Sequence, residues 1–128
     1  MAKAQTKKGE GRQGRADVEA KRAPANGGRF WVRIYEEQGE LLIAAADAEL
    51  LGQVFREPER GLRLEVSDFY RGLETGVDGL RQRLGTGTIL NLVGERTISV
   101  AREMGLVGDE GVMEIGGVPH AQVVFVKR

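Results

Sequence analysis

The first 28 residues of this 128-residue chain contain no aromatic side chain, no leucine and no isoleucine. A segment of this composition cannot bury enough apolar surface to offset the conformational entropy that it loses on ordering. Every large core side chain must therefore come from residues 29–128, which are sufficient for one modest hydrophobic core. The sequence predicts a flexible tail over residues 1–28 and a single compact domain over residues 29–128.

Charge is divided unequally between these two parts. Residues 1–28 carry seven basic and three acidic side chains, a net charge of +4, whereas the other 100 residues carry twelve and sixteen, a net charge of −4. A basic tail of this kind is typical of a segment that contacts a polyanion, and a merely solvated tail is the alternative. The candidate contacts to RNA phosphates in the tail are Lys3, Lys7, Lys8, Arg12, Arg15, Lys21 and Arg22.

Several functional classes are disfavoured by what the sequence lacks. The absence of cysteine excludes disulfides, zinc–thiolate sites and cysteine nucleophiles. There is no Walker-type loop, dinucleotide fingerprint, nucleophile elbow or acidic cluster with metal spacing, so we expect no cofactor and no metal, and an enzyme has no positive support. No apolar run approaches the roughly 18 residues of a membrane span, and the N-terminus lacks the apolar segment of a signal peptide. We therefore expect a cytoplasmic protein.

Apolar periodicity predicts the first half of the domain. The stretch RFWVRIYEE has the two-residue period of a strand, and ELLIAAAD follows as its hairpin partner after a turn at Gln38–Gly39. Asp47 is predicted to cap a helix that ends near Arg56, before Pro58 and Gly61. The buried side of that helix would consist of Leu50, Leu51, Val54 and Phe55. Residues 62–66 (LRLEV) are predicted to form a third strand.

The second half is predicted to contain two helices and a final hairpin. A short helix is expected near Val77–Leu84, and a longer one from Thr88 to a glycine cap at Gly105. The stretches VMEI and HAQVVFV then have the composition of strands. This order mixes hairpins with helices, so the predicted fold is α+β: a two-layer sandwich in which helices cover one face of a small mixed sheet.

The stretch IGGVPHAQ (residues 115–122) combines a glycine pair, a proline and the only histidine. Gly116–Gly117 suits a two-residue hairpin turn, which would pair residue 115 with 118, 114 with 119, and 113 with 120. Pro119 lacks an N–H donor, so we expect it at a sheet edge or where the strand bends away. The turn and the proline account for the other unusual residues but not for His120. Its role is a structural hydrogen bond, a binding contact or catalysis, and the sequence leaves these three alternatives open.

The stretch NLVGERT (residues 91–97) is the second candidate site. If residues 88–105 form one helix, Asn91, Glu95 and Arg102 lie on a polar stripe opposite its apolar face. Gly94 inside a helix indicates either close packing at that point or a helix that begins only near Glu95. Arg96 is expected to extend to solvent or to pair with a carboxylate. The alternatives are a ligand- or RNA-contacting stripe and an ordinary amphipathic helix.

Aromatic and basic side chains alternate on the first strand as the third candidate site. Trp31, Arg33 and Tyr35 share one face, with Arg63 and Glu65 as candidates to extend it, and an open face of this kind could stack unpaired bases. A helix covering that face would instead make the aromatics core residues.

The stretches FWVRIY, LIAAAD, NLVGERT and IGGVPHAQ, in this order, make the chain resemble a small archaeal family known as domain of unknown function 424. The resemblance covers about residues 30–126 and is carried mainly by NLVGER and GGVPHAQ. It implies a compact two-layer α/β domain of a cytoplasmic archaeal protein, an association with the translation apparatus, and no established activity. The basic tail departs from the plain family domain. The residues that the family motifs mark are Asn91, Gly94, Glu95, Arg96, Gly116, Gly117, Pro119, His120 and Gln122.

Three functional hypotheses follow. The first is a non-enzymatic accessory protein that associates with RNA or the ribosome, with the tail on phosphates and the domain on RNA or translation proteins. The second is a small-molecule-binding or catalytic domain with its site between the motifs at 91–96 and 116–122. The third is a protein-interaction module without nucleic acid.

Overall fold

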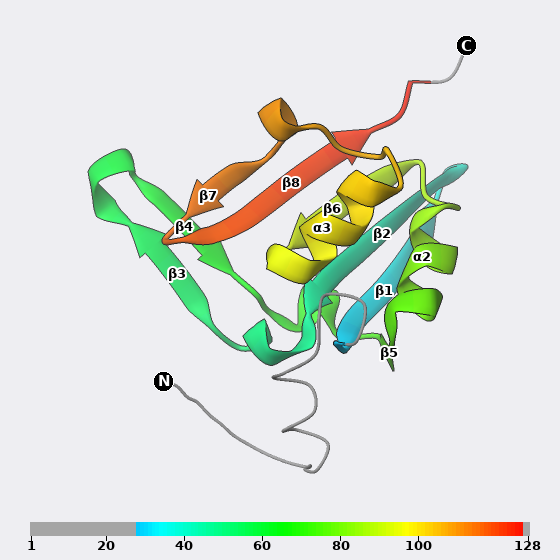
Figure 1. Cartoon of the computed structure of the whole chain (residues 1–128), viewed down its shortest axis with the longest axis horizontal. Helices are drawn as coiled ribbons and strands as arrows, with labels where there is room; N and C mark the ends of the chain where they lie inside the picture. Colours follow the sequence, from blue (N-terminus) through cyan, green and yellow to red (C-terminus); the bar gives the residue numbers. More distant parts are fainter. Residues whose placement is uncertain (1–27, 127–128) are drawn as a thin grey trace.

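The computed structural model describes residues 28–126, and the predicted tail lies outside this range except for Gly28. A six-stranded mixed sheet has the strand order β5-β1-β2-β6-β8-β7 (Figure 1). Its central strands β2 and β6 are parallel, and the other neighbouring pairs are antiparallel. The strands are β1 (Phe30–Glu37), β2 (Glu40–Asp47), β5 (Leu73–Thr75), β6 (Ile89–Val93), β7 (Met113–Ile115) and β8 (Val118–Val124).

Both helices, α2 (Val77–Leu84) and α3 (Glu95–Glu103), cover the same face of this sheet (Figure 1). Alternate residues of the central strands, such as Ile43, Leu90 and Leu92, are fully buried beneath them. Leu80 and Leu84 of α2 and Ile98 of α3 fill the same cluster. The α+β architecture with helices on one face is therefore confirmed.

The opposite face of the sheet is partly covered by a second, two-stranded sheet. This hairpin consists of β3 (Val54–Glu57) and β4 (Leu62–Glu65), and it extends beyond the end of β7 (Figure 1). Its inner residues Phe55 and Leu64 pack with Ile115 of β7. The 3-10 turn η5 (Asp68–Tyr70) covers the neighbouring part of the same face through Phe69 and Tyr70.

The predicted helix from Asp47 to Arg56 is wrong. Only a 3-10 turn, η3 (Ala48–Leu50), follows β2, and residues 54–57 form β3 instead. Gly52 donates its N–H to the Val66 carbonyl oxygen at 2.7 Å, which turns the chain toward the hairpin. The apolar residues that suggested a helical stripe pack against a sheet, and periodicity in so short a run cannot separate these two environments.

The predicted helix from Thr88 to Gly105 is half wrong, because residues 89–93 form the central strand β6 and only 95–103 form α3. β6 carries apolar residues on both faces, because Leu90 and Leu92 point to the helices and Val93 points to the other side, so its sequence lacks the alternation of a surface strand. The alternative that the helix begins near Glu95 is the correct one, and the polar stripe of Asn91, Glu95 and Arg102 does not exist. The helix near Val77–Leu84 is confirmed, as is the β1–β2 hairpin with its turn at Gln38–Gly39.

The final hairpin forms with the predicted register. Ile115 pairs with Val118, Glu114 with Pro119 and Met113 with His120, and Gly116 and Gly117 both have positive φ. The expected edge position of Pro119 is wrong, since β8 has β6 as its other neighbour. The β6–β8 ladder begins only at His120, so the missing N–H of Pro119 lies outside it.

Candidate functional site

The motif NLVGERT spans the end of β6 and the first turn of α3, and Gly94 forms the junction. Gly94 has φ 111° and ψ 152°, a backbone conformation that is essentially restricted to glycine. Its N–H donates to the Pro119 carbonyl oxygen at 2.9 Å, which joins this motif to the PHAQ stretch of β8. A side chain on Gly94 would overlap the carboxyl group of Asp47. The close packing that the sequence suggested at Gly94 is therefore present.

Asp47 caps the helix α3, although the two lie about fifty residues apart. Its carboxylate is 3% exposed and accepts the backbone N–H groups of Arg96 at 3.1 Å and Thr97 at 2.8 Å. The Thr97 hydroxyl donates to the same carboxylate at 2.8 Å. Helix N-termini carry unpaired N–H donors that attract anions. Here an internal carboxylate occupies that position, so the motif is closed to a phosphate ligand.

Arg96 closes this junction from the outside. Its guanidinium donates to both carboxylate oxygens of Glu49 at 2.7 Å and to the Arg29 carbonyl oxygen at 3.2 Å. The side chain is only 21% exposed and lies over the Phe30 ring, and Gly28 packs directly against it. The expectation that Arg96 pairs with a carboxylate is confirmed, and its two terminal nitrogens donate within the fold, whereas its buried Nε has no hydrogen-bond partner among the described residues. Glu95, by contrast, is exposed in the first turn of α3.

The charges of this junction stabilise one another. Burial raises the pKa of Asp47, and the Arg96 charge and backbone N–H oppose that rise. Burial also acts to raise the pKa of Glu49, but the hydrogen bonds and charge of Arg96 outweigh it, so the pKa of Glu49 is lowered. Arg96 correspondingly has a raised pKa, because the two carboxylates outweigh its desolvation. The junction between β2 and α3 is thus stabilised by four side chains, those of Asp47, Glu49, Arg96 and Thr97. Sequence analysis missed the contributions of Asp47, Glu49 and Thr97.

The remaining motif residues gather on the sheet face opposite the helices. Asn91 of β6 lies directly across from Gln122 of β8, and His120 is two residues before Gln122 on the same strand. Asn91 and His120 are half-buried and Gln122 is exposed. Because alternate residues of a strand share a face, all three side chains point to the same side of the sheet. The structure therefore brings Asn91, which the sequence had placed on a helix, together with His120 and Gln122 of the predicted final strand.

Hydrogen bonds fix the orientation of two members of this polar cluster. The Tyr70 hydroxyl donates to Asn91 Oδ1 at 2.6 Å, and burial raises the pKa of Tyr70 to about 12, so that it stays a donor. His120 Nδ1 lies 3.0 Å from the Leu92 carbonyl oxygen. Because that oxygen can only accept, Nδ1 carries the proton and Nε2 is an acceptor in the neutral ring. Tyr70 is a member of the site that sequence analysis missed.

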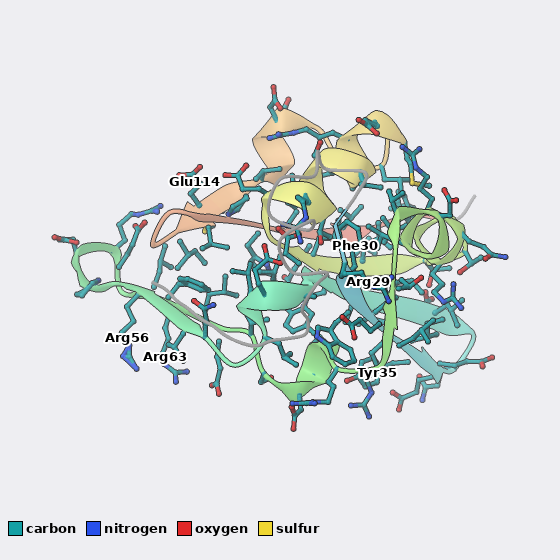
Figure 2. The ribbon with its side chains drawn as sticks, turned by 60° about the horizontal axis from the view of Figure 1, so that its bottom comes forward. Arg29, Phe30, Tyr35, Arg56, Arg63 and Glu114 are labelled. Carbon is teal, nitrogen blue, oxygen red and sulfur yellow. The ribbon has the colours of Figure 1, made fainter. Side chains whose placement is uncertain are left out.

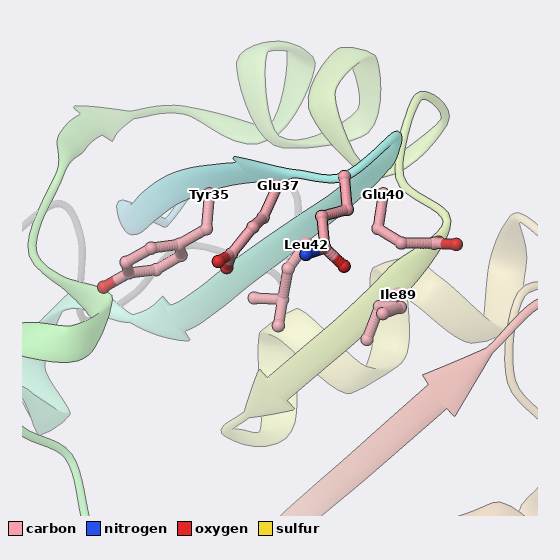
Figure 3. Close-up of a pocket in the computed structure, with 6 residues that line it drawn as sticks. Tyr35, Glu37, Glu40, Leu42 and Ile89 are labelled. Carbon is pink, nitrogen blue, oxygen red and sulfur yellow. The ribbon is translucent and has the colours of Figure 1, made fainter.

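A shallow apolar pocket of about 270 Å³ lies on the same face, near the β1–β2 turn (Figure 3). Tyr35, Leu42 and Ile89 line it, with the side chains of Glu37, Gln38 and Glu40 around them. The two carboxylates disfavour an anionic ligand here. Among residues 28–126, no group of three acidic or histidine side chains is arranged to hold a metal ion.

The aromatic face of β1 is covered, although not by a helix. The Tyr35 ring stacks on Phe69 of η5 with centroids 4.9 Å apart, and the Arg33 guanidinium lies over Tyr35 at 4.8 Å. Trp31 is half-buried, with the Arg71 guanidinium over its ring at 5.6 Å. The expectation of an open stacking face at Trp31 and Tyr35 is therefore wrong for this structure. The segment around Phe69, whose role the sequence did not reveal, supplies the cover.

Two arginines stand side by side on the outer face of the β3–β4 hairpin. Arg56 and Arg63 are exposed and directly opposite one another, and Figure 2 shows both side chains pointing away from the large sheet. Arg63 contacts Glu65 at 3.3 Å, and no ion pair of Arg56 is present among residues 28–126. Sequence analysis missed Arg56 because it was placed on a helix. The turn sequence PERG followed by the alternating LRLE was the signal of a hairpin, whereas VFRE before the turn does not alternate.

The hairpin is fastened to the β7–β8 turn by polar contacts. The Gly116 N–H donates to Glu57 Oε2 at 2.8 Å, and Arg60 donates to the Glu114 carbonyl oxygen at 2.6 Å. This N–H and the Arg60 guanidinium lower the pKa of Glu57. Gly116 and Gly117 are therefore needed for the turn and its packing, and Pro119 accepts the Gly94 N–H. These three motif residues have structural roles.

The fold and this site define a class of small α+β proteins in which a mixed sheet has helices on one face and a polar cluster on the other. The chain belongs to the family described as protein of unknown function (DUF424), whose model matches residues 35–126. It is also similar to the crystal structure of an uncharacterized conserved protein from Methanopyrus kandleri. That similarity has a TM-score of 0.62 at 26% identity and covers 78% of this chain and 96% of the other.

The resemblance to the archaeal family is therefore confirmed. Among curated proteins, nothing matches the chain. Within residues 28–126, no helix has the length and apolar character needed to span a membrane.

Proposed function

We propose that this protein is a non-enzymatic, RNA-associated accessory protein of the archaeal translation apparatus, acting in the cytoplasm. The observation that carries the proposal is the Arg56–Arg63 pair on the outer face of the β3–β4 hairpin. Like charges directly opposite on neighbouring strands destabilise a hairpin, and a bound polyanion removes that repulsion. Arginine suits this role because its guanidinium binds phosphate oxygens through two parallel hydrogen bonds.

Two further features support a polyanionic partner. The sequence of residues 1–28 has a net charge of +4, which adds cationic groups to the chain that carries the hairpin. Two arginines on the helix-bearing side are already paired, because Arg81 contacts Glu103 at 2.9 Å and Arg102 contacts Asp109 at 3.2 Å. On the hairpin, Arg56 has no ion pair among residues 28–126, and Arg63 has only the exposed contact to Glu65 at 3.3 Å.

The arrangement gives no support to an enzyme. His120 donates to a backbone carbonyl oxygen rather than to a carboxylate, and within the described residues no serine or threonine hydroxyl is hydrogen-bonded to its ring. The carboxylates Asp47 and Glu49 are engaged by α3 and Arg96. These residues hold the fold together, which leaves binding as the function that the open face supports.

The test uses the full-length protein and a labelled single-stranded oligouridylate, with fluorescence anisotropy measured over a series of salt concentrations. We expect the double variant R56Q/R63Q to bind at least tenfold more weakly at low salt. Its plot of log K against log salt should be shallower by about 1.4, since each phosphate contact on a single strand contributes about 0.7. The matched control R81Q/R102Q removes the same charge from the helix-bearing side and should leave the slope unchanged.

An equal effect of both double variants would show that net charge alone matters and would remove the hairpin from the proposal. No measurable binding of the wild-type protein at low salt would overturn RNA association.

A further inference from the structure

The polar cluster of Asn91, His120 and Gln122 combines neutral hydrogen-bonding groups with apolar neighbours. Register places Ile89 and Val124 in the row beside Asn91–Gln122, and Met113 directly across from His120. Val124 and Met113 are 67% and 47% exposed, so this part of the face is open to a partner. No residue on these rows of β6, β7 and β8 is ionisable apart from His120. A cluster of this composition fits a flat, uncharged partner with its own donors and acceptors.

The orientation of two side chains of the cluster, Asn91 and His120, is fixed in advance. Asn91 Oδ1 accepts from Tyr70, so the Nδ2 donors of its amide point away from that hydroxyl. His120 Nδ1 is held by the Leu92 carbonyl oxygen, which leaves Nε2 as an acceptor. The exposed Gln122 amide supplies one donor and one acceptor across from Asn91. Donors and acceptors thus lie side by side on two paired strands, and preorganised groups lose less entropy on binding.

We propose that this cluster binds the edge of an unpaired adenine base. Asparagine and glutamine amides match the adjacent donor and acceptor of adenine, whereas guanine is matched best by arginine or lysine, which this cluster lacks. Unpaired bases in RNA are bound through such edges, with apolar side chains against their faces. Met113 and Val124 offer that apolar contact. The inference rests on the proposed RNA association and adds a base preference to it.

The arginine pair of the hairpin and the polar cluster have different roles in the proposed binding of RNA. Arg56 and Arg63 contact phosphates and hold any strand, and the polar cluster distinguishes one base from another. Both lie on the side of the large sheet opposite α2 and α3, since the hairpin packs on that face and the cluster is part of it. Affinity and base preference are therefore separable by mutation.

The experiment compares an oligouridylate with the same oligomer carrying one central adenine, using anisotropy on the full chain. We expect the wild-type protein to bind the adenine-containing oligomer at least fivefold more tightly. Q122A and N91D should both bring this ratio to one, and Q122A, which adds no charge, should leave oligouridylate affinity unchanged. N91D keeps the oxygen that accepts from Tyr70, and Q82A on the exposed side of α2 is the matched control. R56Q/R63Q should weaken both oligomers and keep the ratio.

A readout that does not depend on mutation is the NMR spectrum of the side-chain amide groups. The NH₂ resonances of Asn91 and Gln122 should shift with the adenine-containing oligomer and not with oligouridylate. Adenosine, which presents adenine without any phosphate, should bind at least a hundredfold more weakly, and equal affinity would overturn strand recognition. An unchanged ratio in Q122A and N91D overturns this inference and leaves the proposed function standing. If neither oligomer binds, both are overturned.

Discussion

Gly94 is essential to the junction between β6 and α3 because no other residue fits its backbone conformation and surroundings without strain. Its φ of 111° and ψ of 152° place it where other residues are strained, and the Asp47 carboxyl group fills the space that a Cβ would need. The same residue ends the central strand β6 and begins α3, so Asp47 can reach the first N–H groups of the helix. The glycine in NLVGER is thus explained by backbone conformation and close approach, without a ligand.

The first prediction compares two glycines that both have positive φ. G94A should destabilise the protein by about 3 kcal/mol or more, because backbone strain adds to overlap with Asp47. G105A, at φ 75° with open space around it, should cost only about 1–2 kcal/mol. Urea unfolding of both variants measures the difference. Equal costs would show that the Asp47 carboxyl group moves away freely and is not a tight cap.

At the scale of elements, Arg96 and Glu49 fasten the end of β2 to the beginning of α3. The pair is bidentate, with both N–O distances at 2.7 Å, but the Glu49 side chain is 57% exposed, so solvent screens part of its contribution. Because the pKa of Glu49 is lowered in the folded protein, its contribution is fully present above about pH 4.5. That contribution is lost as the pH falls through the lowered pKa. Asp47 has the opposite effect on the pH dependence of stability. Because its pKa is raised in the folded protein, its contribution to stability is present in acid and is lost as the pH rises through the raised pKa.

The second prediction tests this contact through its pH dependence. At pH 6 we expect E49Q to reduce the free energy of unfolding by about 1 kcal/mol, and this cost should shrink as the pH falls below 4.5 and through the lowered pKa of Glu49, where the wild-type side chain also becomes neutral. The control E103Q removes the surface pair with Arg81, in which both side chains are about half exposed, and should change stability by less than about 0.5 kcal/mol across this pH range. A cost of E49Q that stays the same down to the lowest pH at which the protein is folded would assign the effect to packing rather than to charge.

At the scale of the whole molecule, the two faces of the sheet have different roles. The helix-bearing face contains the larger apolar cluster, whereas the other face combines a smaller cluster with the open polar residues and the protruding hairpin. The basic sequence of residues 1–27 precedes Gly28, which packs on Arg96. A truncation that retains Gly28 therefore leaves the described contacts of Arg96 intact.

The third prediction concerns this truncation. Deleting residues 1–27 should leave the midpoint and cooperativity of thermal unfolding unchanged, because both apolar clusters of the described structure are formed by residues that the truncation retains. RNA affinity should fall, and its salt dependence should become shallower, since cationic side chains are removed. Calorimetry and anisotropy on the same truncated protein provide the two readouts. A salt slope equal to that of the full chain would exclude the tail from RNA binding.

Local chemistry allowed the sequence by itself to determine several parts of this protein. The β1–β2 hairpin follows from two-residue alternation, and the register of β7 and β8 follows from a glycine pair that only one kind of turn accommodates. The candidate residues could also be identified from short stretches of sequence. Glycine, proline and histidine in unusual combinations indicate a special backbone conformation or a polar contact.

Tertiary structure decided what local patterns could not. Residues 89–93 contact apolar neighbours on both faces, so their sequence lacks the period that separates a strand from a helix. Aspartate is a residue type that caps helices, so the sequence indicated a capping role for Asp47. Only the parallel pairing of β2 with β6 determined that it caps α3 rather than the next segment of the chain. Asn91, His120 and Gln122 meet because β6 and β8 pair in one register, a long-range hydrogen-bonding choice that the spacing of residues along the chain does not encode.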